Sequence, residues 1–112
     1  MDMGSMVMVA GVVTQGYGNS QVESYKVSVS SDASNWTWVD GSRNFTCKTH
    51  SHDMKIQNTF ESPVRGRYVR VHPQTWEGSP LMKAGVLLVD RMTPGNNENV
   101  YRYIYILFWS DW

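Results

Sequence analysis

A two-residue alternation of apolar and polar side chains limits what this chain can fold into more than any other feature of its sequence. Residues 66–72 read Gly-Arg-Tyr-Val-Arg-Val-His, and residues 24–30 read Ser-Tyr-Lys-Val-Ser-Val-Ser. In each stretch the valines fall on one face and the charged or hydroxyl side chains on the other, which is the pattern of a half-buried strand. No long window shows the three-four apolar spacing of an amphipathic helix. The sequence therefore predicts an all-β protein.

Clusters of glycine, asparagine, serine and proline separate the expected strands. Residues 14–21 are expected to form a loop, and Pro63 and Pro73 are each expected to end a strand, because proline cannot donate to a ladder. The expected strands are residues 6–13, 24–30, 36–40, 55–60, 66–72 and 81–90. Strands at this spacing predict an antiparallel sandwich or barrel.

The apolar run Met6–Val13 lies so close to residue 1 that a secretion signal has to be considered. A signal peptide needs a positively charged start before its apolar segment. Here no lysine or arginine precedes Lys26, and Gly4 and Ser5 interrupt the beginning. The run is also of strand length, so we expect a strand that is buried on both faces.

Charge and cysteine content exclude several classes of function. Ten basic and ten acidic residues among the 112 give a formal net charge of zero, which argues against a nucleic-acid or membrane partner held by bulk charge. It leaves open a membrane contact made through a few apolar loop tips. Cys47 is the only cysteine, so neither an internal disulfide nor a cysteine zinc site can form. We expect a small, half-buried side chain rather than a reactive thiol.

Motifs for catalysis are missing from the sequence. It contains no G-x-S-x-G elbow, no H-E-x-x-H and no phosphate loop, and Asp53 and Glu61 have no evident acid and base roles. His50, His52 and Asp53 lie within four residues, which raises the question of a metal. Because a third suitably placed ligand is not evident, we predict that the chain binds no metal. Because the catalytic motifs are missing, we predict no cofactor and no enzyme activity.

The order of the motifs resembles the discoidin domain, also called the coagulation factor V/VIII type C domain. The matching stretches are DMGSMVMVAGVVTQG, SYKVSVSSDASNWTWV, NTFESPVRGRYVRVHPQTW and LMKAGVLLV, which together run from residue 2 to residue 89. The resemblance implies an antiparallel β-sandwich of jelly-roll, galactose-binding-like type. It also implies an extracellular binding module for cell-surface sugars, anionic phospholipids, collagen or other proteins.

The resemblance also implies that the domain is incomplete. The pattern matched by residues 2–4 lies inside the family's domain, so roughly the first third of a domain of ~150 residues has no counterpart here. The two cysteines that close the family's domain are absent, and Gly85 stands where an acidic residue is usual. We therefore expect a partial domain over residues 1–89 and an unmatched tail over residues 90–112.

Family members contact ligands with loops gathered at one end of the sandwich, and the resemblance places one such loop at residues 17–21. Tyr17 offers an aromatic face, while Asn19, Ser20 and Gln21 offer hydrogen bonds to hydroxyl groups. A plain solvated loop has the same composition. Because the loop is mostly polar, a glycan or protein ligand is favoured over a phospholipid.

Other residues complete the predicted site. His50 and Asp53 lie in a stretch that the resemblance places near the binding end, where they are expected to contact sugar. Trp76 matches a widespread family tryptophan, and we expect it to fill the core, with stacking on a ligand as the alternative. Arg70 is expected to pair with a buried carboxylate or with carbonyl groups.

Asn35 and Asn44 each begin an N-glycosylation sequon, which agrees with an extracellular location, although the chain itself shows no signal peptide.

The sequence thus predicts a non-catalytic extracellular module that binds cell-surface glycan, anionic phospholipid or matrix protein in cell adhesion, without nucleic acid and without a transmembrane segment. Two alternatives remain. One is a carbohydrate-binding accessory module of an enzyme, and the other is a truncated product without binding function.

Overall fold

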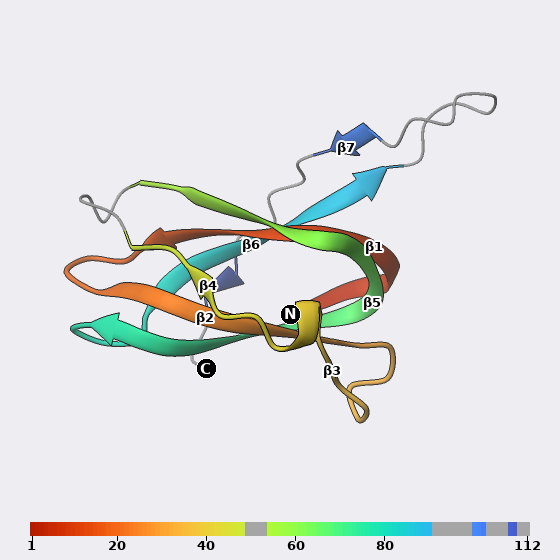
Figure 1. Ribbon diagram of the computed structural model, residues 1–112, viewed down its shortest axis with the longest axis horizontal. Helices are drawn as coiled ribbons and strands as arrows, with labels where there is room; N and C mark the ends of the chain where they lie inside the picture. Colours follow the sequence, from red (N-terminus) through yellow and green to blue (C-terminus); the bar gives the residue numbers. More distant parts are fainter. Residues whose placement is uncertain (49–53, 91–99, 103–107, 110–112) are drawn as a thin grey trace.

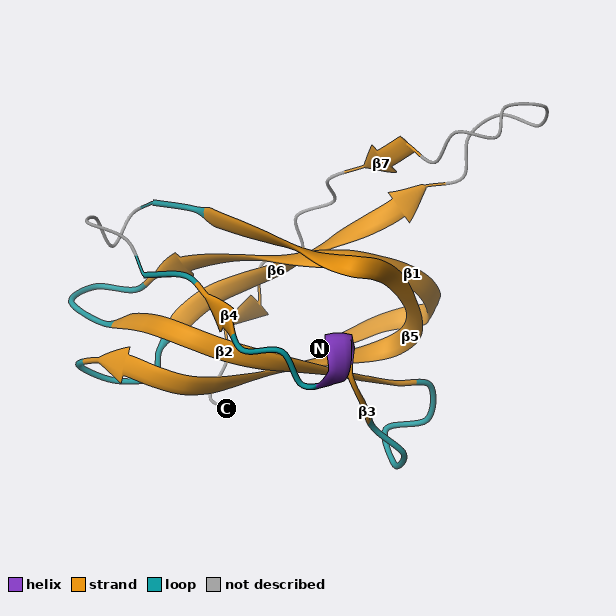
Figure 2. Ribbon diagram, in the orientation of Figure 1, coloured by secondary structure: helices purple, strands orange, loops and turns teal. Residues whose placement is uncertain are grey.

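The computed structural model describes residues 1–48, 54–90, 100–102 and 108–109. Strands make up most of this part of the chain, and one short 3₁₀ helix, η1, interrupts them (Figure 2). The elements are β1 (Asp2–Gly16), β2 (Gln21–Ser30), β3 (Thr37–Trp38), η1 (Val39–Gly41), β4 (Phe45–Thr46), β5 (Ile56–Glu77), β6 (Met82–Asp90), β7 (Val100–Arg102) and β8 (Phe108–Trp109).

All strand pairs are antiparallel, and the strands follow the order β3-β2-β5-β1-β6-β7, with β4 beside β2 and β8 beside β6. The strand β5 is 22 residues long, and its first half pairs with β1 while its second half pairs with β2. Figure 1 shows β5 curving around one end of the molecule, so that its two halves lie in opposite layers. The chain is a β-sandwich, as the sequence predicts.

The two prolines do not end strands, and that prediction was wrong. Pro63 lies inside β5, where the register against β1 moves from Thr59 opposite Gly11 to Val64 opposite Val9. Such an irregularity tolerates proline because the extra residues donate no regular ladder hydrogen bond. Pro73 is paired with a β2 residue beside another register shift, so β5 continues to Glu77 for the same reason.

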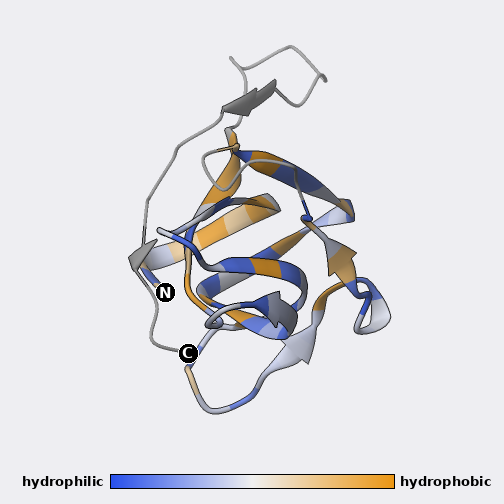
Figure 3. Cartoon of the chain, turned by 90° about the vertical axis from the view of Figure 1, so that its left-hand side faces the viewer, coloured by the Kyte–Doolittle hydropathy of each residue, from blue (hydrophilic) through white to orange (hydrophobic). Residues whose placement is uncertain are grey.

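The core lies between the two layers. The predicted inward face is confirmed, because Val27 and Val29 of β2 and Val69 and Val71 of β5 are buried with the aromatic rings of the core. The strand β2 is not half-buried as expected, because its serines are also at most 5% exposed. Figure 3 shows the resulting bands of hydrophobic and hydrophilic residues along the strands. The buried aromatic residues are Tyr25, Phe45 and Phe60.

The strand β1 is buried on both faces over part of its length only. Val9 and Val12 contribute to the main core, while Ala10 and Val13 form a second cluster with Leu87. The methionines at positions 6 and 8 are 41% and 39% exposed, so the expectation holds for the second half of the run. The strand also extends to Gly16, which shortens the expected loop 14–21 to a turn at residues 17–20.

The predicted boundary near residue 89 stays a prediction. The described parts of the tail, β7 and β8, pair with β6, and the other tail residues lie outside the described part of the chain.

Gly11 marks a very close approach between β1 and β5. A Cβ atom added here would lie 2.3 Å from the main-chain oxygen of Asn58 and 3.0 Å from a methyl carbon of Leu87. The neighbouring backbone belongs to the strand ladder, so it cannot move away without breaking the pairing.

We predict that Gly11→Ala lowers the free energy of unfolding by about 1–3 kcal/mol, because overpacking of this size forces backbone shifts. Chemical denaturation of the variant and of the full wild-type chain measures the difference. The control Ser5→Ala lies on an exposed position of the same strand and should change stability little. Equal stability of Gly11→Ala and the wild type would contradict the close approach.

The turn after β2 is organised by one carboxylate. Asp32 accepts hydrogen bonds from the main-chain N–H groups of Ser34 and Asn35, both at 2.8 Å, and these contacts hold the pKa of its carboxyl far below the usual value. Ala33, which lies between Asp32 and Ser34, has a φ of 64°, in the left-handed region. An alanine side chain has no polar group to compensate that conformation.

We predict that Ala33→Gly raises the free energy of unfolding by about 0.5–1 kcal/mol, because relief of a left-handed penalty of ~1–2 kcal/mol exceeds the entropic cost of glycine. Thermal melts of the two proteins provide the test. Ser34→Gly, one residue further on and without a positive φ, should give no such gain. A lower melting temperature for Ala33→Gly would refute the argument.

Candidate functional site

Two connections of the fold meet at one end of the sandwich, which we call the loop end. It consists of the turn at residues 17–20 and the β5–β6 connection at residues 78–81. Tyr17 and Ser20 exchange two main-chain hydrogen bonds of 3.0 and 2.9 Å, and the N–H of Ser79 donates to Ser20 Oγ at 3.2 Å. Both connections lie at the left of Figure 1, and Figure 3 looks onto this end. The two connections therefore support one another.

Large side chains are exposed at the loop end. Tyr17 is 44% exposed, Trp76 is 45% exposed and Met54 is 56% exposed. The expectation that Trp76 fills the core was wrong. It lies opposite Val22, close to the point where both strands end, and its side chain remains largely in solvent while Val22 is buried. An exposed Trp76 is compatible with the alternative prediction, in which its ring stacks on a ligand.

The structure separates the other predicted site residues. Asn19 is exposed, whereas Ser20 accepts the hydrogen bond that joins the two connections and Gln21 is only 5% exposed. Gln21 is thus poorly placed for direct contact with a large ligand. His50 and Asp53 lie outside the described residues, so their predicted sugar contacts stay predictions.

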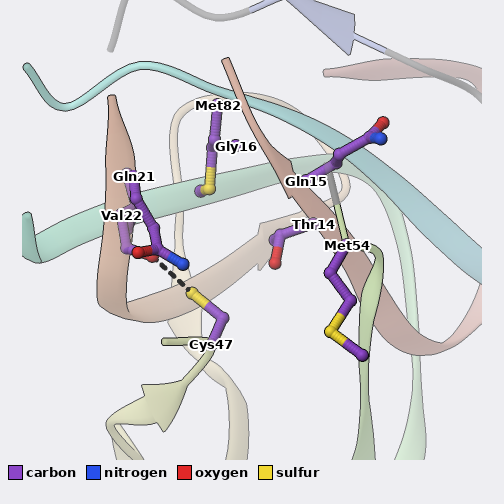
Figure 4. A pocket seen from close by; sticks show the side chains of 8 residues that line it. All are labelled: Thr14, Gln15, Gly16, Gln21, Val22, Cys47, Met54 and Met82. Atoms are coloured by element: carbon purple, nitrogen blue, oxygen red, sulfur yellow. Dashed lines mark hydrogen bonds between the residues drawn. The ribbon is translucent and has the colours of Figure 1, made fainter. Parts of the chain in front are cut away.

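A small open pocket lies beside the loop end, with an empty volume of about 210 Å³. Its lining residues are Thr14, Gln15, Gly16, Gln21, Val22, Cys47, Met54 and Met82 (Figure 4). Most of this space is open to solvent, and the enclosed volume is about 10 Å³, which is room for about one water molecule. The pocket is therefore a notch that fits a single chemical group and does not enclose a ligand.

Lys48 ties the segment after β4 to this end of the sheet. Its Nζ lies 3.1 Å from a carboxylate oxygen of Glu23 and 3.9 Å from one of Glu77. The hydrogen bond with Glu23 raises the pKa of Lys48. The positive charge of Lys48 is therefore already balanced, and the exposed rings are the main features that this end offers to a ligand.

Cys47 is buried at the inner wall of the pocket. Its Sγ donates to the carbonyl oxygen of Val22 at 3.0 Å (Figure 4), and burial raises the pKa of the thiol to about 11. The thiolate is the reactive form of cysteine. The expectation of an unreactive side chain agrees with this environment, although Cys47 is more deeply buried than expected.

We predict that Cys47 in the folded chain reacts with a disulfide reagent at pH 8 far more slowly than in denaturant. Burial keeps the reagent away from the sulfur, and the raised pKa lowers the fraction of thiolate. The absorbance of the released thiolate measures the rate in each condition. Equal rates in buffer and in denaturant would contradict the buried environment.

Metal ligands do not gather in the described part of the chain, where no three histidine, cysteine, aspartate or glutamate side chains lie close enough to hold an ion. The helix of the described residues is too short to cross a membrane. Asn35 and Asn44 are both exposed, and their glycosylation stays a prediction.

Arg70 differs from expectation. It is exposed, and its guanidinium carbon lies 4.1 Å from the centroid of the Trp36 ring. The predicted pairing with a buried group was therefore wrong, because the residue faces outward from β5.

The architecture is that of an antiparallel β-sandwich with two mutually supporting connections at one end. The sequence model of the F5/8 type C domain matches residues 1–86, and the chain belongs to that family.

Curated and solved proteins agree with this assignment. Lactadherin of Mus musculus is 35% identical over 93 residues, and neuropilin-1 of Xenopus laevis is 36% identical over 86 residues. These matches cover 78% and 69% of this chain. Discoidin II of Dictyostelium discoideum has a similar structure, with a TM-score of 0.72 over 85% of this chain at 20% identity.

The chain is much shorter than these proteins. It spans 20% of mouse lactadherin, 9% of Xenopus neuropilin-1 and 38% of the discoidin II chain.

Proposed function

We propose that this chain is a non-catalytic extracellular binding module that meets its ligand with the loop end. The observation that carries the proposal is the pair of exposed rings, Tyr17 and Trp76, at the same end of the sandwich. Tryptophan and tyrosine dominate binding energy at interfaces, since they bury a large area at a small cost in conformational entropy.

The surroundings of Tyr17 and Trp76 favour a ligand that packs against the ring faces over a ligand that is held by charge. Tyr17 is held in a closed turn by its two hydrogen bonds to Ser20, and Trp76 stands on a strand of the sheet. Rigid supports of this kind lower the entropic cost of binding. The paired charge of Lys48 leaves little excess positive charge for an anionic surface.

The family supports the same function. The resemblance implies ligands such as cell-surface glycan, anionic phospholipid or matrix protein, and a role in cell adhesion outside the cell. An amphipathic ring can stack on a sugar, pack on a protein or enter a lipid headgroup region. The mostly polar loop and the paired charge of Lys48 favour a glycan or protein over an anionic phospholipid.

We predict that Tyr17→Ala and Trp76→Ala each weaken binding about tenfold or more, as expected for hot-spot rings. The probes are phosphatidylserine vesicles against phosphatidylcholine vesicles, immobilised collagen, and a panel of immobilised glycans, each with the full 112-residue chain. The control Met8→Ala removes an exposed apolar side chain in β1 and should bind as the wild type does. Failure of all probes to bind, or an equal loss in Met8→Ala, would overturn the proposal.

A further inference from the structure

The outer face of the sheet carries a second group of aromatic and basic side chains, away from the core. Two small residues of β2, Ser28 and Ser30, are only 3% and 4% exposed although they point outward. Trp38 of β3 is paired with Ser28, and Ser28 is paired on its other side with Arg70 of β5. The three residues therefore form a row across three strands, with the smallest side chain in the middle.

Contacts fix the side chains of this row and of their neighbours. The Trp38 ring lies 4.8 Å from the His72 ring, whose Nε2 is 2.8 Å from Ser28 Oγ. The Trp36 ring lies under the guanidinium of Arg70 at 4.1 Å. Despite its contact with His72, Trp38 remains 47% exposed. We call the surface formed by Trp36, Trp38, Arg70 and His72 the indole platform.

The positive charge on the indole platform is not balanced by acidic groups. Arg70 is exposed, and Lys26 projects from the β2 position opposite His72. Among the described residues no carboxylate lies within ion-pair distance of either cation. Stacking on Trp36 uses the flat face of the guanidinium and leaves its N–H edge free to donate to a planar or multivalent acid group.

We propose that the indole platform binds a sugar that carries an acid group, such as a uronate or a sulfated pyranose. The apolar face of one sugar ring stacks on Trp38, and the acid group on the neighbouring sugar accepts hydrogen bonds from Arg70. Trp38 and Arg70 are separated by two strand spacings of ~4.8 Å each. This separation suits a disaccharide in which one sugar stacks on Trp38 and the acid group of the neighbouring sugar reaches Arg70. This site is additional to the loop end and does not depend on it.

The platform fits an acidic sugar better than the other anions that a protein meets. A nucleic acid needs many phosphate contacts, whereas the chain has a formal net charge of zero. In the described part of the chain, the cationic side chains placed beside these rings are Arg70 and Lys26. A membrane requires apolar tips that protrude, whereas Trp38 lies against His72 on a sheet.

The test compares two disaccharides that differ in one group, glucuronic acid linked to glucose and cellobiose, by titration against the full chain with tryptophan fluorescence and NMR. We expect the acidic disaccharide to bind about tenfold more tightly, since one charge-assisted, bidentate contact distinguishes them. Trp38→Ala should weaken both sugars. Arg70→Gln should remove the preference, and Arg70→Lys should restore it only in part.

Met8→Ala is the control, because it removes an exposed apolar side chain of β1 that belongs to neither candidate surface, and it should leave sugar binding within about twofold. If Arg70→Gln fails to give a cooperative melt, Lys26→Gln tests the charge preference instead. Equal affinity for the two sugars, no binding of either, unchanged binding by Trp38→Ala, or tighter binding of a single-stranded oligonucleotide would each overturn the proposal.

Discussion

The pairing of β5 with both β1 and β2 is the constraint on which the rest of the structure depends. One strand of 22 residues runs through both layers, and its bend brings the valines of its second half over those of β1. The pairing of β5 with β1 is irregular near Pro63, so β5 can bend there and still remain hydrogen-bonded to its neighbours. Because the layers share this strand, the core, the loop end and the outer face keep fixed positions relative to one another.

The same strand supplies both candidate binding surfaces. Its alternation turns Val69 and Val71 into the core, so Arg70 and His72 face outward, where they contact the indoles of Trp36 and Trp38. At the far end of β5, Trp76 lies opposite Val22, which is close to the turn that carries Tyr17. Rigid support on a sheet reduces the entropic cost that a flexible loop would add to binding.

Prediction from the sequence was accurate where one strand's own pattern decides the outcome and inaccurate where a neighbour does. The faces of β2 and β5 and the fold class follow from the alternation and from the matching motifs. The effect of the two prolines depends on where the register against another strand shifts, which the local sequence does not contain. The exposure of Trp76 and the burial of Gln21 depend in the same way on what lies opposite them at the strand ends.

By itself the sequence determined which side chains of a strand share a face, that a single cysteine cannot form an internal disulfide, and which family the chain resembles. Only the tertiary structure decided which faces meet: Trp36 with Arg70, Trp38 with His72, and Ser20 with Ser79. The physical reason is that the two-residue alternation specifies which face of a strand each side chain occupies, but not which strand lies beside it. The partner is set by long-range pairing and register, which depend on packing of the whole core.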